Sequence, residues 1–271
     1  MGQGERRNRL GCDRMNSNTQ EQDVLQAAIE QLYTTFAVYP GRRRPPMVRP
    51  GVSNRDLEPL LLTPPRFLTL DELSIYLSES VMAWTAVEDF KHFLPRLLEC
   101  LSRESSGYRY WDYPDFLGQK LRQTRWQSWV EPEQQVVLDY FIVLWRFVLS
   151  AFPSPHPDFR KASLFLRCLA HFIEDPEPFL VLWQQAPSLA ALRHLAQFVL
   201  EEAADIAGGQ NTWWDRWEQG KWERGRQEQV KRWLLSPLTC RILEEAFYRY
   251  SDEPVAQEFI QAHDWLSVLL L

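Results

Sequence analysis

Residues 85–103 read TAVEDFKHFLPRLLECLSR and hold the clearest secondary-structure signal in the chain. Thr85 and Glu88 have the spacing of a capping box, in which a hydroxyl and a carboxylate satisfy free backbone N–H groups at a helix start. The apolar side chains that follow recur with a helical period; they are Val87, Phe90, Leu94, Leu97, Leu98 and Leu101. The stretch therefore predicts an amphipathic helix over 86–102 that buries one face.

Similar signals extend from this helix in both directions. Further helices are expected over 21–36, 70–83, 115–126, 132–152, 159–174, 189–206, 213–234 and 236–250, with a short one after 176 and a last one from about 252. Thr69 and Glu72 form a second capping box, and Asp158, Ser188 and Ser236 precede later helix starts. No segment shows the alternating polarity of a strand. We expect an all-α protein of about ten helices, either an antiparallel stack of helical hairpins (a HEAT-like solenoid) or an irregular helical bundle.

Three parts are expected along the chain. Residues 1–20 are polar and lack a hydrophobic period, which is typical of a disordered tail. Residues 21–66 combine a first helix with a linker rich in proline and arginine, and the prolines predict that this linker contains no helix. Residues 67–271 are expected to form a single helical domain. The helix at 132–152 is apolar nearly all round and should lie at its centre.

Composition narrows the class of protein. The formal net charge is −6, yet residues 1–50 hold eight Arg, no Lys and five acids, a net of +3. Any interaction with anions is thus expected in the N-terminal part. The cysteines have no metal-ligand spacing, which indicates a reduced, cytoplasmic protein; they are Cys12, Cys100, Cys168 and Cys240. The N-terminus has no secretory signal, and the longest apolar run, 136–152, is too short and too polar to span a membrane.

The segment from Thr85 to Glu99, TAVEDFKHFLPRLLE, resembles a segment of a family of uncharacterised bacterial all-helical proteins. The resemblance extends weakly backward through 67–73 to 36–40 and so covers about the first third of the chain. It implies a bacterial origin and no particular activity. Members of that family often carry a Cys-x-x-Cys pair in the linker. Here the linker reads MVRPGVS over 47–53, so the resemblance supplies no metal ligands for this chain.

The polar-site candidates are Glu88, His92, Asp139 and Arg146. Carboxylates three and four residues before His92 could orient it as a catalytic base. We favour a structural histidine, ion-paired at the surface or bonded to the preceding linker, because acids near a histidine are common by chance. Asp139 and Arg146 lie on one face of their helix, as an ion pair, a helix edge or a functional dyad. No two-histidine box, nucleophile motif or phosphate-binding loop occurs, so no catalytic residue, metal ligand or cofactor is assigned.

Two segments are candidates for binding. The first is aromatic and helical in spacing, with acids that neutralise its bases, which favours packing or protein-contact anchors; its residues are Trp213, Trp214, Trp217 and Trp222. The second is the basic run Arg42, Arg43 and Arg44, followed by Arg49, which could contact phosphate, an acidic protein or only solvent. The function expected is therefore a non-enzymatic helical module that binds an unknown protein partner. The alternatives are an enzyme or metal protein whose site is assembled from scattered helices, and nucleic-acid association through the Arg42–Arg49 linker, which we do not favour.

Overall fold

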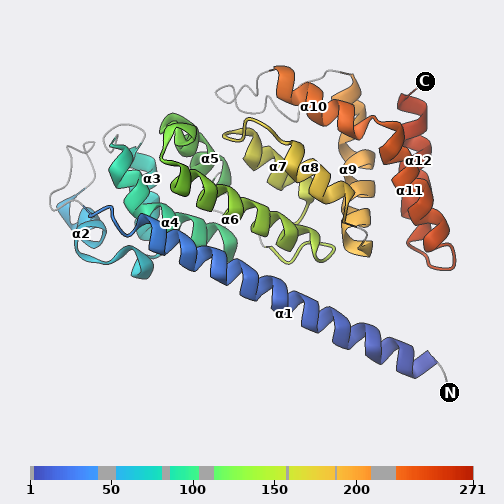
Figure 1. The fold of residues 1–271 in the computed structure, drawn as a ribbon, viewed down its shortest axis with the longest axis horizontal. Coiled ribbons are helices and arrows are strands. Elements are labelled where there is room, and N and C mark those ends of the chain that lie inside the picture. The colour runs from blue at the N-terminus through green and yellow to red at the C-terminus, as the bar shows by residue number, and fades with distance from the viewer. Residues whose placement is uncertain are drawn as a thin grey trace. The chain divides into compact units, whose positions relative to one another are not determined.

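The computed structural model describes residues 3–41, 53–80, 86–103, 113–156, 159–186, 188–208 and 224–270 (Figure 1). Every regular element in these ranges is a helix, so the all-α class is confirmed. The choice between a solenoid and a bundle stays a prediction. The chain divides into two compact units, residues 22–144 and residues 1–21 with 145–271. The single domain expected over 67–271 extends across both units and stays a prediction.

The unit of residues 22–144 contains most of the predicted capping and linker features. Its elements are the second part of α1 (Gln3–Phe36), α2 (Asn54–Leu62), the 3₁₀ turn η1 (Pro65–Phe67), α3 (Leu70–Ser80), α4 (Val87–Arg103), α5 (Tyr113–Gln123), η2 (Trp126–Ser128) and the first part of α6 (Glu131–Leu149). The capping box before α3 is formed, since the Thr69 backbone N–H donates to Glu72 at 2.7 Å and the Glu72 N–H donates to the Thr69 hydroxyl at 3.3 Å. Thr85 of the other predicted box lies outside the described residues.

Two expectations for the N-terminal part of the chain are corrected. Helix α1 begins at Gln3 and not near Glu21, so most of the expected tail is helical. No proline interrupts this stretch, and a missing apolar period does not prevent a local helix. The linker also contains a helix, α2. Residues 51–58 of the linker contain no proline. The burial of Leu57 and Leu60 stabilises α2 although Pro59 lies inside this helix.

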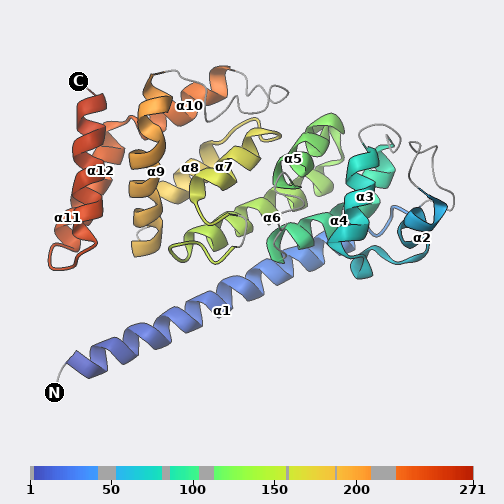
Figure 2. The same ribbon diagram turned by 180° about the vertical axis from the view of Figure 1, so that it is seen from behind.

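The unit of residues 1–21 and 145–271 holds α7 (Ala162–Ala170), α8 (Glu177–Gln184), α9 (Leu189–Ala207), α10 (Arg224–Leu234), α11 (Pro237–Arg249) and α12 (Ala256–Leu269). Helix α12 packs against both α9 and α11, as the views from front and back agree (Figures 1 and 2). Two starts are capped as expected: Ser188 accepts from the Ala191 N–H at 3.1 Å, and Ser236 accepts from the Thr239 N–H at 3.2 Å.

Helix α7 is shorter than the expected 159–174. The Phe159 N–H donates to His156 Nδ1 at 3.0 Å, and the Arg160 carbonyl accepts from the Ser154 N–H, so the chain before Lys161 forms a loop. The expected cap Asp158 lies outside the described residues. After Ala170 the Phe172 N–H donates to the carbonyl of Leu169, three residues earlier, which is the hydrogen bond of a 3₁₀ turn. The α-helix ends here.

Each unit has an aromatic core. In residues 22–144, Trp129 packs edge-on against Phe36 and Phe90, and the fully buried Tyr140 donates a 2.6 Å hydrogen bond to the Leu98 carbonyl. In residues 145–271, Trp145 stacks on Phe165 at 5.0 Å between ring centres and donates to the Phe179 carbonyl. Their polar atoms are satisfied as buried indoles and phenols require. None of the described helices has both the length and the apolar character needed to cross a bilayer.

Candidate functional site

Helix α4 carries several polar side chains that form hydrogen bonds and ion pairs in the unit of residues 22–144. Its apolar stripe is buried as predicted, with Phe90, Leu94 and Leu97 each 0% exposed. The polar side is covered too, because Lys91 and Glu99 are both only 7% exposed. Buried charges are stable only when they are paired. Their partners come from α1, from α6, from the start of the linker and from α4 itself.

Lys91 forms an ion pair with Glu133 of α6, with 2.6 Å between Nζ and Oε2. The Tyr39 hydroxyl donates to the other Glu133 oxygen and accepts a 3.1 Å bond from Lys91. The ammonium lies 4.8 Å and 4.6 Å from the ring centres of Tyr39 and Trp129, within cation–π range. Burial lowers the pKa of Lys91, but its hydrogen bonds with Glu133 and Tyr39 outweigh this and raise the pKa. A lysine kept charged in this way is an anchor and a poor nucleophile.

His92 holds the start of the linker. Its Nδ1 donates a 2.8 Å hydrogen bond to the Tyr39 carbonyl oxygen, and its ring packs edge-on against Phe93. A Cβ added at Gly41 would lie 2.8 Å from His92 Nε2, which is closer than nonbonded atoms approach, so the linker needs a glycine here. A backbone carbonyl therefore orients the ring, as in the structural alternative to a catalytic base.

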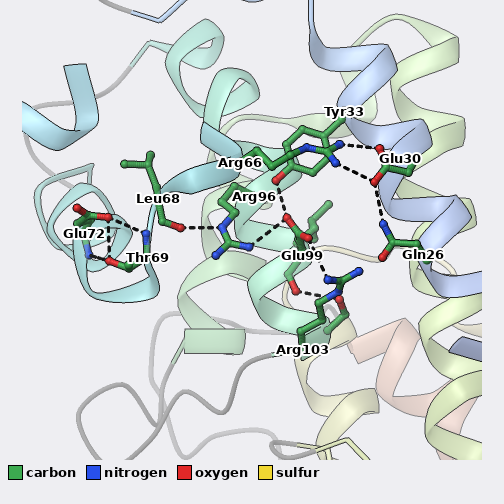
Figure 3. A network of polar contacts seen from close by, with 12 residues as sticks. Gln26, Glu30, Tyr33, Arg66, Leu68, Thr69, Glu72, Arg96, Glu99 and Arg103 are labelled. Atoms are coloured by element: carbon green, nitrogen blue, oxygen red, sulfur yellow. Dashed lines mark hydrogen bonds and ion pairs between the residues drawn. The ribbon is translucent and has the colours of Figure 1, made fainter. Parts of the chain in front are cut away.

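Glu99, one turn further along α4 from Arg96, gathers three cationic or hydroxyl donors (Figure 3). The Tyr33 hydroxyl donates to its Oε2 at 2.7 Å, Arg96 lies 3.1 Å from the same oxygen and Arg103 lies 3.4 Å from Oε1. Burial and the hydrogen bond to Glu99 raise the pKa of Tyr33 well above its usual value. Arg96 also donates at 2.7 Å to the carbonyl of Leu68, at the far end of the linker.

Arg66 joins this far end to α1. Its two terminal nitrogens donate to both carboxylate oxygens of Glu30, at 2.9 Å and 2.6 Å, and its guanidinium lies 4.0 Å from the Tyr33 ring centre (Figure 3). The hydrogen bond from Arg66 lowers the pKa of Glu30. A bidentate, stacked arginine has little freedom left. Both ends of the linker, Tyr39–Gly41 and Arg66–Leu68, are thus attached to α1 and α4.

At the far end of the linker the chain presents two exposed apolar side chains on a short turn, which we call the 62–67 turn. Leu62 is 73% exposed and Phe67 is 72% exposed. The neighbours Leu60 and Leu68 are 2% and 0% exposed, so the chain is anchored in the core on both sides. The Phe67 N–H donates to the Pro64 carbonyl at 2.9 Å, which fixes the turn between them. The prolines of the linker indicated a turn, but nothing in the sequence indicated that Leu60 and Leu68 are buried on its two sides.

The predicted polar-site residues within the described part of the chain do not form one hydrogen-bonded or ion-paired group. Glu88, Asp139 and Arg146 are exposed, and Asp139 accepts a 2.8 Å bond from Gln135 one turn earlier on α6. Asp139 and Arg146 are therefore positions at a helix edge. The remaining predicted residues lie outside the described residues; they are Arg42, Arg43, Arg44, Trp213, Trp214, Trp217 and Trp222.

Among the described residues of the unit of residues 1–21 and 145–271, His194 of α9 has a strongly shifted pKa. Its side chain is 1% exposed. Its Nε2 donates a 3.0 Å hydrogen bond to the Ala151 carbonyl, and its ring packs edge-on against Phe152. Burial lowers the pKa of His194 to about 4, although the Ala151 carbonyl partly offsets this. The neighbouring Arg193 makes a bidentate pair with Glu258 of α12, at 2.9 Å and 2.7 Å. A neutral, buried imidazole here joins α9 to the loop after α6 and does not face solvent.

No group of three or more His, Cys, Asp or Glu side chains suited to a metal ion occurs among the residues that the structure describes. Comparisons with known proteins return no match, since no family model, no curated protein and no solved structure is similar to this chain. The resemblance of residues 85–99 to a bacterial family therefore stays an expectation. Any function has to be argued from the chain's own geometry.

Proposed function

We propose that this chain is a helical module that binds another protein, and that Leu62 and Phe67 are the anchors of its binding surface. One observation supports the proposal: two large apolar side chains, each more than 70% exposed, lie on a turn whose backbone is attached on both sides. Single exposed apolar residues are common on protein surfaces. A few anchor residues carry most of the energy of a protein interface, and a rigid support lowers the free energy lost in ordering them.

The attachment of the turn on both sides matters because ordering mobile groups on binding costs free energy. Arg66, one residue before Phe67, is held by both oxygens of Glu30, and the Leu68 carbonyl is held by Arg96. The turn consequently needs little ordering when a partner arrives, which improves affinity without any new contact. The turn is thus suited to insert into a pocket that already exists on the partner.

The chemistry of the partner follows from the surroundings of the turn. The pocket must be apolar to accept Leu62 and Phe67. Helices α2 and α3, which flank the turn and pack on each other, expose Glu58 and Asp71 against the single base Arg55. A basic rim around the pocket would complement this acidic balance and raise the association rate. Full burial of two such side chains contributes about 3 to 6 kcal/mol.

The test compares three forms of the full chain as bait in affinity capture from the native host, at low and at high salt. The forms are the wild type, the double variant Leu62→Ser with Phe67→Ser, and a control with Val38→Ser and Val130→Ser. The control removes two apolar side chains of the same unit that are 73% and 62% exposed. We expect one protein to remain on the wild type and the control at high salt and to leave the double variant.

The captured protein is then purified and its dissociation constant is measured with each form. The double variant should bind at least about a hundredfold more weakly, as the loss of about 3 kcal/mol implies. Equal binding by all three forms, or capture of no protein by any of them, removes the proposal. Salt-labile capture of nucleic acid that disappears on replacing Arg42, Arg43 and Arg44 with Ala would instead favour the linker arginines as the binding site.

A further inference from the structure

Helix α11 has a second face that its own unit does not cover. Thr239, Leu243 and Ala246 are buried on the side that packs against α12. The opposite side carries a row of four exposed residues with spacings of three, four and three, which we call the α11 row: Leu238, Arg241, Glu245 and Tyr248. Leu238 is 40% exposed and Tyr248 is 67% exposed. Spacings of three and four in turn are those of the seam of a coiled coil.

The α11 row is symmetric in position and complementary in charge. Leu238 and Tyr248 lie equally far before and after Leu243, and so do Arg241 and Glu245. If two copies of α11 pack antiparallel about a two-fold axis at Leu243, Leu238 of each copy meets Tyr248 of the other. Arg241 of each copy then meets Glu245 of the other. An isologous interface requires such self-complementarity.

The charged pair is available for such a contact. Neither Arg241 nor Glu245 has an ion-pair or hydrogen-bond partner within the described part of the chain. Although they lie four residues apart on one helix, the acid follows the base, which is the less favourable order for pairing within a helix. Their charges are therefore unused inside one copy and opposite between two antiparallel copies.

We propose that the α11 row is a homotypic interface, through which a second copy of this chain docks antiparallel on α11. The flanking positions are compatible with it. Ile242, half-exposed, lies near the axis on one side and adds apolar contact. Glu244 lies near the axis on the other side, where its repulsion of its own copy is offset by Arg241 of the opposite chain.

The length of α11 limits the expected affinity of the dimer. Helix α11 has 13 residues and is therefore about 20 Å long. Two such helices bury less than the roughly 1,200 Å² of a stable interface, so the dimer belongs to the weak, transient class. We expect a dissociation constant on the order of 100 µM for the full chain. A parallel arrangement is excluded by the same row, because it would place Arg241 against Arg241 and Glu245 against Glu245.

The test is the concentration dependence of mass in sedimentation velocity, on the full chain at low salt. The wild type should move from 32.1 kDa toward twice that mass. Arg241→Glu and Glu245→Arg should each raise the dissociation constant at least about tenfold, since each puts like charges at both symmetric contacts. An equimolar mixture of these two variants should dimerise again, and so should the chain that carries both changes, because both restore opposite charges across the axis.

Arg232→Glu on α10 and Asp252→Arg in the loop before α12 are the matched controls, as both residues are exposed charges off the row. They should dimerise like the wild type, and circular dichroism should show all variants folded. A wild type that stays monomeric at about 1 mM overturns the proposal, because that exceeds the expected dissociation constant tenfold. Single variants that dimerise like the wild type, or a mixture that stays monomeric, also overturn it. The result is independent of the Leu62 and Phe67 test, since the two surfaces share no residue.

Discussion

Acidification should weaken this fold in part through the buried residue His194. The imidazole is 1% exposed, and burial lowers its pKa to about 4, whereas an unfolded histidine has a pKa near 6.5. Because the unfolded chain takes up the proton first, the stability that this neutral histidine contributes is complete above about pH 6.5. It is lost as the pH falls from about 6.5 toward 4, and the full loss is about 3 kcal/mol.

The magnitude at one practical pH follows from the same two pKa values. Between pH 7.5 and pH 5.0 the protonation of the unfolded state alone reduces the free energy of unfolding by about 2 kcal/mol. His194→Gln removes the titration but keeps an N–H donor for the Ala151 carbonyl. The variant should therefore lose about 2 kcal/mol less than the wild type over this interval, whatever its stability at pH 7.5.

The assay is urea denaturation at the two pH values, followed by tryptophan fluorescence. His263→Gln is the matched control, because His263 contacts the exposed Asp264 on the surface of α12. This variant keeps His194, so the loss of about 2 kcal/mol that His194 contributes should remain. A difference between wild type and His194→Gln below about 0.5 kcal/mol would refute the reasoning, since the folded imidazole would then titrate like an unfolded one.

Two further predictions concern α4. Lys91→Met should lower the free energy of unfolding by about 3 to 5 kcal/mol, because it leaves Glu133 charged and buried, and adding Glu133→Leu should recover part of that loss; additive effects in urea denaturation would contradict the pairing. Gly41→Ala should cost about 1 to 3 kcal/mol, since the new Cβ meets the His92 ring, and much less in a His92→Ala background; an equal cost in both backgrounds would show that the linker does not lie on this ring.

Local features of the fold were predictable from the sequence. The capping box at Thr69 and Glu72 and the cap at Ser188 involve groups only three residues apart, so the chain carries the whole interaction within one turn. The apolar period of residues 86–102 likewise predicted that the apolar side of α4 is buried, but not that its polar side is covered too. The errors came where burial outweighed a local rule, as in α2, whose Leu57 and Leu60 stabilise a helix that contains Pro59.

The candidate sites were beyond the reach of pattern alone. His92 was singled out for its acidic neighbours, with a bond to the preceding linker as an alternative, but only the fold identifies the Tyr39 carbonyl as its partner. Arg66 and Arg96 have no motif, and their roles appear only when the linker ends meet α1 and α4. Leu62 and Phe67 are apolar residues that a pattern assigns to the core as readily as to the surface.

Residue type and spacing along the chain were enough for the all-α class, for the positions of most helices and for their apolar sides, because helix formation depends on neighbours within about one turn. The pairing of Lys91 with Glu133, 42 residues away, and of Tyr33 with Glu99, 66 residues away, depends instead on which helix faces meet. So does the exposure of the 62–67 turn and of the α11 row. These contacts are visible only in the tertiary structure. The same apolar pattern is compatible with many pairings of helix faces, and side-chain packing selects one of them.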